Sequence, residues 1–240
     1  MKITKYALKS KVEENVRFAV VSDLHGYPSA PVLNAIRGTE PNAVLIPGDV
    51  IHNDNNYKNG IELLKECAKD YPTFVSIGNH EFKMSSDPVA LLKETGATVL
   101  DNEYTKFMGV KIGGLTSGYT ADKKQTHFGS TPPPNTEWLK AFSKIEGYKV
   151  LLCHHPEYYP AYIRDKNIDL ILSGHAHGGQ WRFFGRGLFA PGQGIFPKYT
   201  CGIYEGRLIV SKGVGNPHFI PRINNKPEII LLTIEKEEKY

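Results

Sequence analysis

Residues 172–180 of the chain read LSGHAHGGQ, with His175 and His177 two positions apart among glycines, directly after an apolar run. Neutral imidazole is the commonest metal ligand in proteins. Because residues i and i+2 of an extended backbone project to the same side, the two rings could converge on one metal site. A motif this short also occurs in loops whose histidines only face solvent. The rest of the chain has to decide between these interpretations.

Similar polar clusters follow four other apolar runs. Together the five clusters are Ser22-Asp23-Leu24-His25, Gly48-Asp49, Gly78-Asn79-His80-Glu81, His154-His155-Pro156 and Gly174-His175-Ala176-His177. In open α/β sheets, functional groups gather beyond the carboxyl ends of the strands. Any single cluster could be a turn. Five clusters in the same position relative to an apolar run indicate one shared site.

The candidate ligand atoms in these clusters are oxygen and nitrogen, without thiolates. This chemistry suits a catalytic site for Mn, Fe or Zn better than a closed structural zinc site. One open site needs fewer ligands than the clusters supply. Two ions about 3.5–4 Å apart and bridged by a carboxylate would use them all.

The elements that position these clusters alternate between strand and helix. Short apolar runs predict buried strands at 17–23, 42–49, 72–79, 148–154 and 169–175, and helical spacing predicts helices at 30–38, 60–70, 88–96 and 136–145. Residues 103–117 predict a hairpin turning near Gly109, residues 202–213 predict another turning at Glu205-Gly206, and 227–234 predict a final strand. The pattern favours an α/β fold with two packed sheets and helices outside, in a single domain over residues 1–240.

Composition sets further bounds. The chain has 240 residues, of which 40% are hydrophobic, and a formal net charge of +4, which is too weak a basicity to imply nucleic-acid binding. The three cysteines form no CxxC pair, which favours a reducing compartment. No run is long enough for a signal peptide or a membrane span. A cytoplasmic location is therefore expected.

Taken in order, Asp23-x-His25, Gly48-Asp49, Gly78-Asn79-His80-Glu81, His154 and Gly174-His175-Ala176-His177 resemble the five motifs of the calcineurin-like metallophosphoesterases. The continuation GHAHGGQWR resembles the bacterial phosphodiesterase branch of that superfamily. The resemblance implies a four-layer α-β-β-α sandwich with two mixed sheets, and it implies two bound divalent or transition metal ions.

The resemblance also implies a role for each motif residue. Asp23, His25 and His177 would hold the first metal, Asn79, His154 and His175 would hold the second, and Asp49 would bridge both. His154 is preferred over His155 because the family ligand directly follows the apolar strand. The two histidines of the HAH motif would therefore serve different metals.

His80 would sit at the site as a catalytic residue without binding metal. The implied reaction is in-line attack on phosphorus by metal-bridging hydroxide, with His80 protonating the leaving oxygen. Much of the family has Asp three residues after the bridging Asp, where it orients the catalytic histidine, but this chain has His52 there. His52 could take that role, or it could be an ordinary loop residue with Asp54 or Glu81 orienting His80 instead.

Residues 178–199 combine several aromatic side chains with two arginines. A loop packed on the sheet by its own aromatics is one interpretation. The other is a substrate wall in which Arg182 grips a phosphate and Trp181 stacks on a base or covers an acyl chain.

The sequence therefore predicts a metal-dependent phosphoesterase, a phosphodiesterase or pyrophosphatase acting on a small-molecule or lipid-linked phosphoester. A lipid-linked substrate would be compatible with peripheral membrane association. A metal-dependent nuclease is an alternative that His52 encourages, although no basic stripe is visible and no nucleic-acid partner is expected. A binding module that keeps its metals without catalysis is the alternative outside the enzymes. The sequence does not fix the oligomeric state.

Overall fold

The computed structural model describes residues 1–119, 131–216 and 221–237, and its longer strands form two six-stranded sheets. The first sheet has the order β1 (Lys2–Ser10), β16 (Glu228–Lys236), β2 (Val16–Val20), β3 (Ala43–Pro47), β4 (Thr73–Ser76) and β5 (Thr98–Leu100). Strands β2 to β5 run parallel. The late strand β16 lies between β1 and β2, parallel to the former and antiparallel to the latter.

The second sheet has the order β14 (Gly202–Tyr204), β15 (Leu208–Val210), β9 (Leu170–Ser173), β8 (Lys149–Cys153), β7 (Val110–Leu115) and β6 (Glu103–Phe107). Its four central strands are parallel. Each edge strand is added by an antiparallel hairpin. Both sheets are therefore mixed.

The helices have recognisable start signals and buried faces. Helix α1 spans Ser29–Arg37, α2 Lys58–Asp70, α3 Pro88–Lys93 and α4 Thr136–Ser143. Asp87 and Asn135 cap α3 and α4, because their side chains accept hydrogen bonds from backbone N–H groups of the first turn. In α2 the buried residues Gly60, Leu63, Leu64 and Cys67 recur at helical spacing and so form one face.

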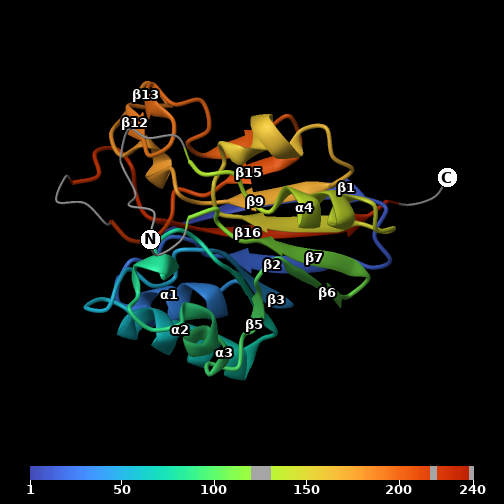
Figure 1. The fold of residues 1–240 in the computed structure, drawn as a ribbon, viewed down its shortest axis with the longest axis horizontal. Coiled ribbons are helices and arrows are strands. Elements are labelled where there is room, and N and C mark those ends of the chain that lie inside the picture. Colours follow the sequence, from blue (N-terminus) through green and yellow to red (C-terminus); the bar gives the residue numbers. More distant parts are fainter. Residues whose placement is uncertain (120–130, 217–220, 238–240) are drawn as a thin grey trace.

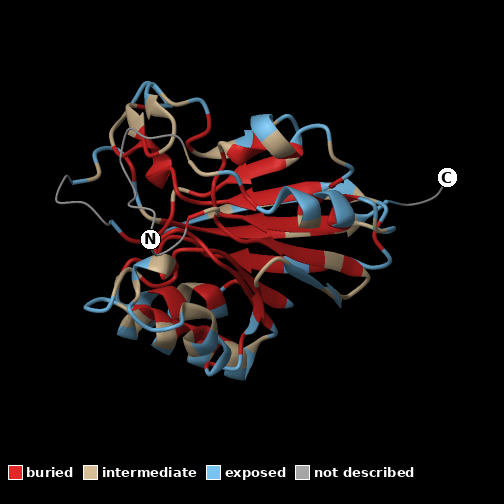
Figure 2. Cartoon of the chain, viewed as in Figure 1, coloured by how far each residue is buried: buried red, intermediate tan, exposed pale blue. Residues whose placement is uncertain are grey.

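Three hydrophobic clusters define four layers (Figures 1 and 2). One cluster joins α1, α2 and α3 to the first sheet. A second joins the facing sides of the two sheets, with Phe18 and Leu45 from the first and Leu152 and Leu172 from the second. The third lies between the second sheet and α4. This is the predicted four-layer α-β-β-α sandwich, and the fold prediction is confirmed.

The structure contains two strands that were not predicted and gives a later segment a different form. Strand β1 was not predicted, because its alternating half-buried residues are diluted by lysines at an exposed edge. Strand β5 was not predicted, because its three residues are too few to produce a strand pattern. Part of the segment 178–199, predicted as a loop or wall, forms two small hairpins, β10 (Arg182–Phe183) with β11 (Arg186–Gly187) and β12 (Phe189–Ala190) with β13 (Gly194–Ile195). Two-residue strands are too short to produce a strand pattern.

Gly114 in β7 lies so close to Leu100 in β5 that a substitution there tests how tightly the two sheets pack. A Cβ atom there would overlap the carbonyl oxygen of Leu100 and lie 2.5 Å from its Cβ. Gly114→Ala is expected to destabilise the protein by about 1–3 kcal/mol through overpacking. Gly38 is the matched control: it has φ −66° at the end of α1, so Gly38→Ala should stabilise by about 0.4–1 kcal/mol. Urea denaturation measures both, and equal midpoints would contradict the predicted packing.

Candidate metal centre

All seven predicted metal ligands come together at the carboxyl edge of the two sheets. Asp23, His25, Asp49 and Asn79 follow β2, β3 and β4 of the first sheet, and His154, His175 and His177 follow β8 and β9 of the second. Each is buried, with no more than 8% of its surface exposed. The site therefore lies in the seam between the sheets and draws ligands from both.

Candidate ligand atoms form four clusters among the described residues, and two of these clusters consist only of predicted ligands. Atoms of Asp23, His25 and His177 lie within 4.8 Å of one another, as do atoms of Asp49, His154 and His175. The other two clusters add His52 and His80 beside His25, and His155 and Glu157 beside His175. Asp49 contacts both groups of predicted ligands, since its Oδ2 atom lies 3.5 Å from Nε2 of His25 and 3.0 Å from Nε2 of His154. The Asp49 carboxylate therefore lies between the two clusters of predicted ligands.

Both polar atoms of the buried Asn79 side chain have no hydrogen-bond partner among the described residues. Nε2 of His25 and Nε2 of His154 make no hydrogen bond of good geometry there and contact only carboxylate oxygens. The other ring nitrogens are in use: Nδ1 of His154 lies 2.9 Å from the carbonyl oxygen of Pro47, and Nδ1 of His25 lies 3.1 Å from Nδ1 of His52. Buried atoms without partners are costly. Their chemistry fits Mn, Fe or Zn, so the residues present fit the implied metal ions.

The ionisation of the buried carboxylates and histidines also favours a bound cation. Burial alone would raise the pKa of Asp23, but His177 and His25 outweigh it and hold that pKa well below the usual range. Burial likewise opposes ionisation of Asp49, and His154 keeps its pKa low. Burial would lower the pKa of His154, but the carboxylate of Asp49 raises it to about 10. Two buried carboxylates thus stay ionised and attract a positive charge, which a metal ion can supply in place of the proton on His154.

The backbone at the ligands is unusual. Asp23, His25, Asp49, His175 and His177 all have positive φ, between 45° and 64°. Side-chain-bearing residues rarely adopt this conformation. Neighbouring glycines leave room for the carboxylate side chains. A Cβ on Gly78 would collide with Oδ1 of Asp49, and one on Gly174 would collide with Oδ2 of Asp23. Close approach of the ligand carboxylates therefore explains two of the glycines in the sequence motifs.

His80 lies beside the ligands, 7% exposed, with its ring 4.4 Å from that of His25. Its Nδ1 atom is 3.1 Å from the carbonyl oxygen of His52, so the backbone of His52 orients it. The His52 ring also stacks on the His80 ring at 4.5 Å. His52 thus contacts both His80 and His25, and its catalytic role stays a prediction.

The two alternative orienting residues make their hydrogen bonds elsewhere. Asp54 accepts from the backbone N–H of Ser85 at the surface. Glu81 is fully buried, and its carboxylate accepts from the backbone N–H groups of Asp49, Ile51 and Gly78. Glu81 therefore fixes the loops that carry the ligands rather than the ring of His80.

Sequence reasoning missed three further residues at the centre. Nζ of Lys83 lies 2.9 Å from Nε2 of His80, Nη2 of Arg222 lies 3.2 Å from Nδ1 of His177, and Oε1 of Glu157 lies 3.7 Å from Nε2 of His175. Lys83 and Glu157 could have been noticed, since each stands three residues after a predicted site histidine. Arg222 is distant in sequence and gives no such signal.

Trp181 and Arg182 follow the ligand loop and are tied to it. The indole N–H of Trp181 donates to the carbonyl of Pro221 at 2.9 Å. The guanidinium of Arg182 donates to the carbonyl of Gly178 at 2.6 Å and to the hydroxyl of Thr200 at 3.1 Å. These contacts hold the segment against the ligand loop, as the packing interpretation expects, and they leave the substrate role a prediction.

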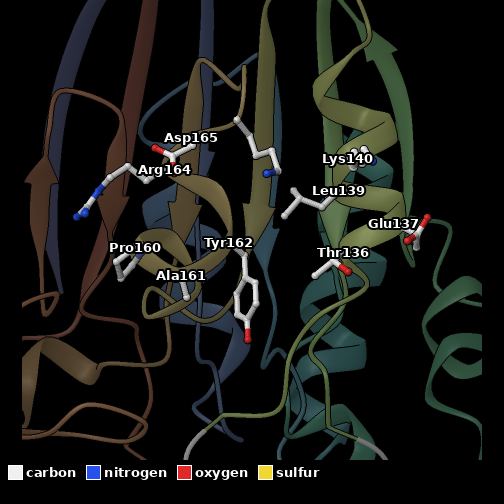
Figure 3. A pocket seen from close by; sticks show the side chains of 10 residues that line it. Thr136, Glu137, Leu139, Lys140, Pro160, Ala161, Tyr162, Arg164 and Asp165 are labelled. Carbon is white, nitrogen blue, oxygen red and sulfur yellow. The ribbon is translucent and has the colours of Figure 1, made fainter.

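A separate pocket of about 240 Å³ lies between α4 and the short helical turn Tyr159–Ile163 (Figure 3). Its lining mixes acidic and basic side chains, and Arg164 is already paired with Glu205 at 2.9 Å. None of the predicted site residues lines it. It is not part of the metal centre.

The sequence model of the calcineurin-like phosphoesterase family matches residues 16–179 of this chain. The chain therefore belongs to the calcineurin-like phosphoesterase family, a class of metal-dependent hydrolases that act on phosphoester bonds. This confirms the predicted family and enzyme class.

Individual relatives agree. The phosphodiesterase YaeI of Escherichia coli is 29% identical over 212 residues, covering 81% of this chain and 71% of YaeI. An uncharacterized metallophosphoesterase of Helicobacter pylori is 27% identical, covering 85% of this chain and 56% of its own length. A related protein of Campylobacter jejuni is 30% identical, covering 81% and 51%. The chain thus spans only about half the length of the latter two.

Among solved structures, the phosphopantetheinyl hydrolase of Mycobacterium tuberculosis aligns with 83% of this chain and 89% of its own. The TM-score is 0.48 and the sequence identity 12%, values that support no functional comparison. Separately, no helix within the described parts of the chain has both the length and the apolar character needed to cross a bilayer.

The adjacent histidines His154 and His155 allow a paired test of the ligand set. Nε2 of His155 is 2.8 Å from the hydroxyl of Ser117, so that nitrogen already has a hydrogen-bond partner. His154→Ala is therefore expected to lower the number of metal ions bound per chain, whereas His155→Gln should keep it. Elemental analysis after dialysis measures the stoichiometry. A larger loss in the His155 variant would assign the ligand to His155 instead.

Proposed function

We propose that the protein is a dinuclear metal-dependent phosphodiesterase or pyrophosphatase acting on a small-molecule or lipid-linked phosphoester. The observation that carries the proposal is the position of Asp49, whose carboxylate contacts ligands of both donor groups. Asp23, His25 and His177 would hold one ion, Asn79, His154 and His175 the other, and Asp49 both. When bound, two such ions activate water as a nucleophile and neutralise phosphoryl charge.

The chain's own residues supply the remaining steps. His80 lies beside His25 and is not one of the proposed metal ligands, so it would act on the leaving oxygen instead. Its Nδ1 atom is held at the His52 carbonyl, and its Nε2 atom lies 2.9 Å from Nζ of Lys83. The His80–Lys83 pair would deliver a proton to the leaving oxygen as the phosphoester bond breaks. Lys83 would also attract the anionic substrate.

Arg182 and Trp181 remain the proposed substrate-binding residues, acting on the part of the substrate remote from the reacting phosphorus. Interactions with such a remote part assist only substrates that have one. A substrate panel of model diesters, nucleotides, nucleotide sugars and lipid phosphates, each with Mn, Fe and Zn, would identify the class. Turnover of diesters with a salt-insensitive rate supports the proposal, whereas a steep salt dependence would favour a nuclease.

The shared carboxylate is tested by metal binding. The wild-type protein is expected to bind about two transition-metal ions per chain. Asp49→Asn should lose both ions more readily than His177→Ala, because Asp49 serves both groups. Titration with a chelator, followed by elemental analysis, compares the variants. A single tightly held ion in metal-replete wild type would refute the dinuclear proposal.

His80 is tested by its dependence on the leaving group. His80→Ala is expected to keep full metal content and to lose about 10²–10⁴-fold in rate on substrates with poor leaving groups, the usual contribution of general acid catalysis. The loss should be much smaller for a nitrophenolate leaving group, which hardly needs a proton. Steady-state kinetics on both substrate types gives the comparison. Equal losses on both would mean that His80 does not protonate the leaving group.

A further inference from the structure

The two small hairpins after the ligand loop form a lobe, residues 182–198, at the edge of the molecule (Figure 1). Several apolar side chains of this lobe are exposed. Phe183 is 49% exposed, Phe184 105%, Ile195 65% and Phe196 76%. Single exposed apolar residues are ordinary, but several large ones on one small lobe indicate a candidate contact site. These four residues, called the hairpin tips below, come from one short stretch of chain.

The hairpin tips lie mostly outside the three hydrophobic clusters of the fold. Phe184 has φ 50° and Gly185 φ 80°, a left-handed turn in which Asn or Gly is the favoured first residue. Phe196 also has positive φ, at 54°. An aromatic residue in this conformation is strained. With its ring in solvent, Phe184 recovers none of that strain through burial, so its presence points to an external partner.

A basic pocket of about 330 Å³ adjoins the tips. Three cations line it, Arg182, Arg186 and Lys198, together with Phe196. None of its lining residues is acidic. The acidic side chain of Glu205, next to the lining residue Tyr204, is already bound to Arg164 at 2.9 Å and to the hydroxyl of Tyr159 at 2.8 Å. The pocket therefore has the charge to receive an anionic group.

We propose that the hairpin lobe docks the protein on an anionic phospholipid bilayer. The lipid phosphate enters the basic pocket, and the hairpin tips insert at the boundary between head groups and acyl chains. Apolar insertion and basic charge are the two terms that hold a protein at a membrane surface. Arg186 and Phe196, from different hairpins, border the same pocket. One lipid surface can therefore contact the apolar tips and the basic side chains at the same time.

The lobe is attached directly to the ligand loop. Arg182 donates to the carbonyl of Gly178, next to the predicted ligand His177. Docking would thus hold the metal centre close to the membrane surface. The docking proposal does not depend on which phosphoester is hydrolysed.

Vesicle sedimentation tests the proposal with the 240-residue chain. Wild type should bind vesicles of phosphatidylcholine with phosphatidylserine and bind pure phosphatidylcholine weakly. Phe184→Ser should weaken binding at least about tenfold, from the loss of one inserted aromatic ring. Arg186→Glu should also weaken it about tenfold, because each basic charge near an anionic surface contributes about 1 kcal/mol. Absence of binding by wild type to the anionic vesicles would overturn the proposal.

Two control variants make equivalent substitutions outside the hairpin lobe. Tyr104→Ser removes an exposed aromatic ring from β6, the edge strand opposite β14. Lys65→Glu makes the same charge reversal on α2. Both should bind vesicles as wild type does. Equal weakening by a control and its partner would show that general charge or hydrophobicity is responsible, and would overturn the proposal.

Competition with free phosphate distinguishes docking on a bilayer from binding of a soluble anion in the pocket. Inorganic phosphate at moderate concentration should displace little protein from vesicles, because it competes for the pocket but not for the hairpin tips. Complete displacement, with no effect of Phe184→Ser, would show that the pocket is a soluble-anion site and would overturn the docking proposal. Thermal melting of each variant, and its turnover of a soluble diester, confirm that the fold and the metal centre are intact.

Discussion

The structure depends on the burial of two carboxylates, Asp23 and Asp49, in the seam between the sheets. Removing a carboxylate from water costs several kcal/mol unless opposite charge compensates it. Here histidines from both sheets surround the pair, with His154 reaching Asp49 from the second sheet at 3.0 Å. The sandwich therefore closes correctly only when the strand ends of both sheets meet at one edge. Cations would hold that edge together, so metal binding and the association of the sheets stabilise each other.

The same constraint explains the strained loops. Five predicted ligands have left-handed backbone conformations, each costing roughly 1–3 kcal/mol. The surrounding structure holds them in place: Glu81 binds three backbone N–H groups of two ligand loops, and Asp23 accepts from the backbone N–H of His175 across the seam. The predicted ligands are thereby held in place by the protein's own hydrogen bonds. Such preorganisation is what catalysis by charge stabilisation requires.

The sequence predicted the parts of the molecule that have strong local signals. Buried strands such as β3 and β8 are continuous apolar runs, and the hairpin at Gly109 has the positive φ that its glycine indicated. Strand β1 was missed because an exposed edge needs no apolar run. Lys83 stands three residues after His80 and could have been noticed from that spacing, whereas Arg222 could be found only from its contact with His177, since such a tertiary contact leaves no mark on spacing. The role of His52 was uncertain for the same reason: its backbone carbonyl, which no sequence pattern reveals, makes the contact with Nδ1 of His80.

The position of β16 has a consequence for biosynthesis. It follows every other described strand along the chain, yet it lies inside the first sheet, between β1 and β2. A nascent chain that has not yet released β16 therefore carries β1 with no neighbour and β2 with one open edge. Unpaired edges of this kind invite aggregation and recognition by chaperones. Strand β2, which leads to Asp23, gains its second neighbour only when translation reaches β16. A chain without β16 therefore has a gap inside the first sheet, and limited proteolysis can distinguish it from a chain that contains β16.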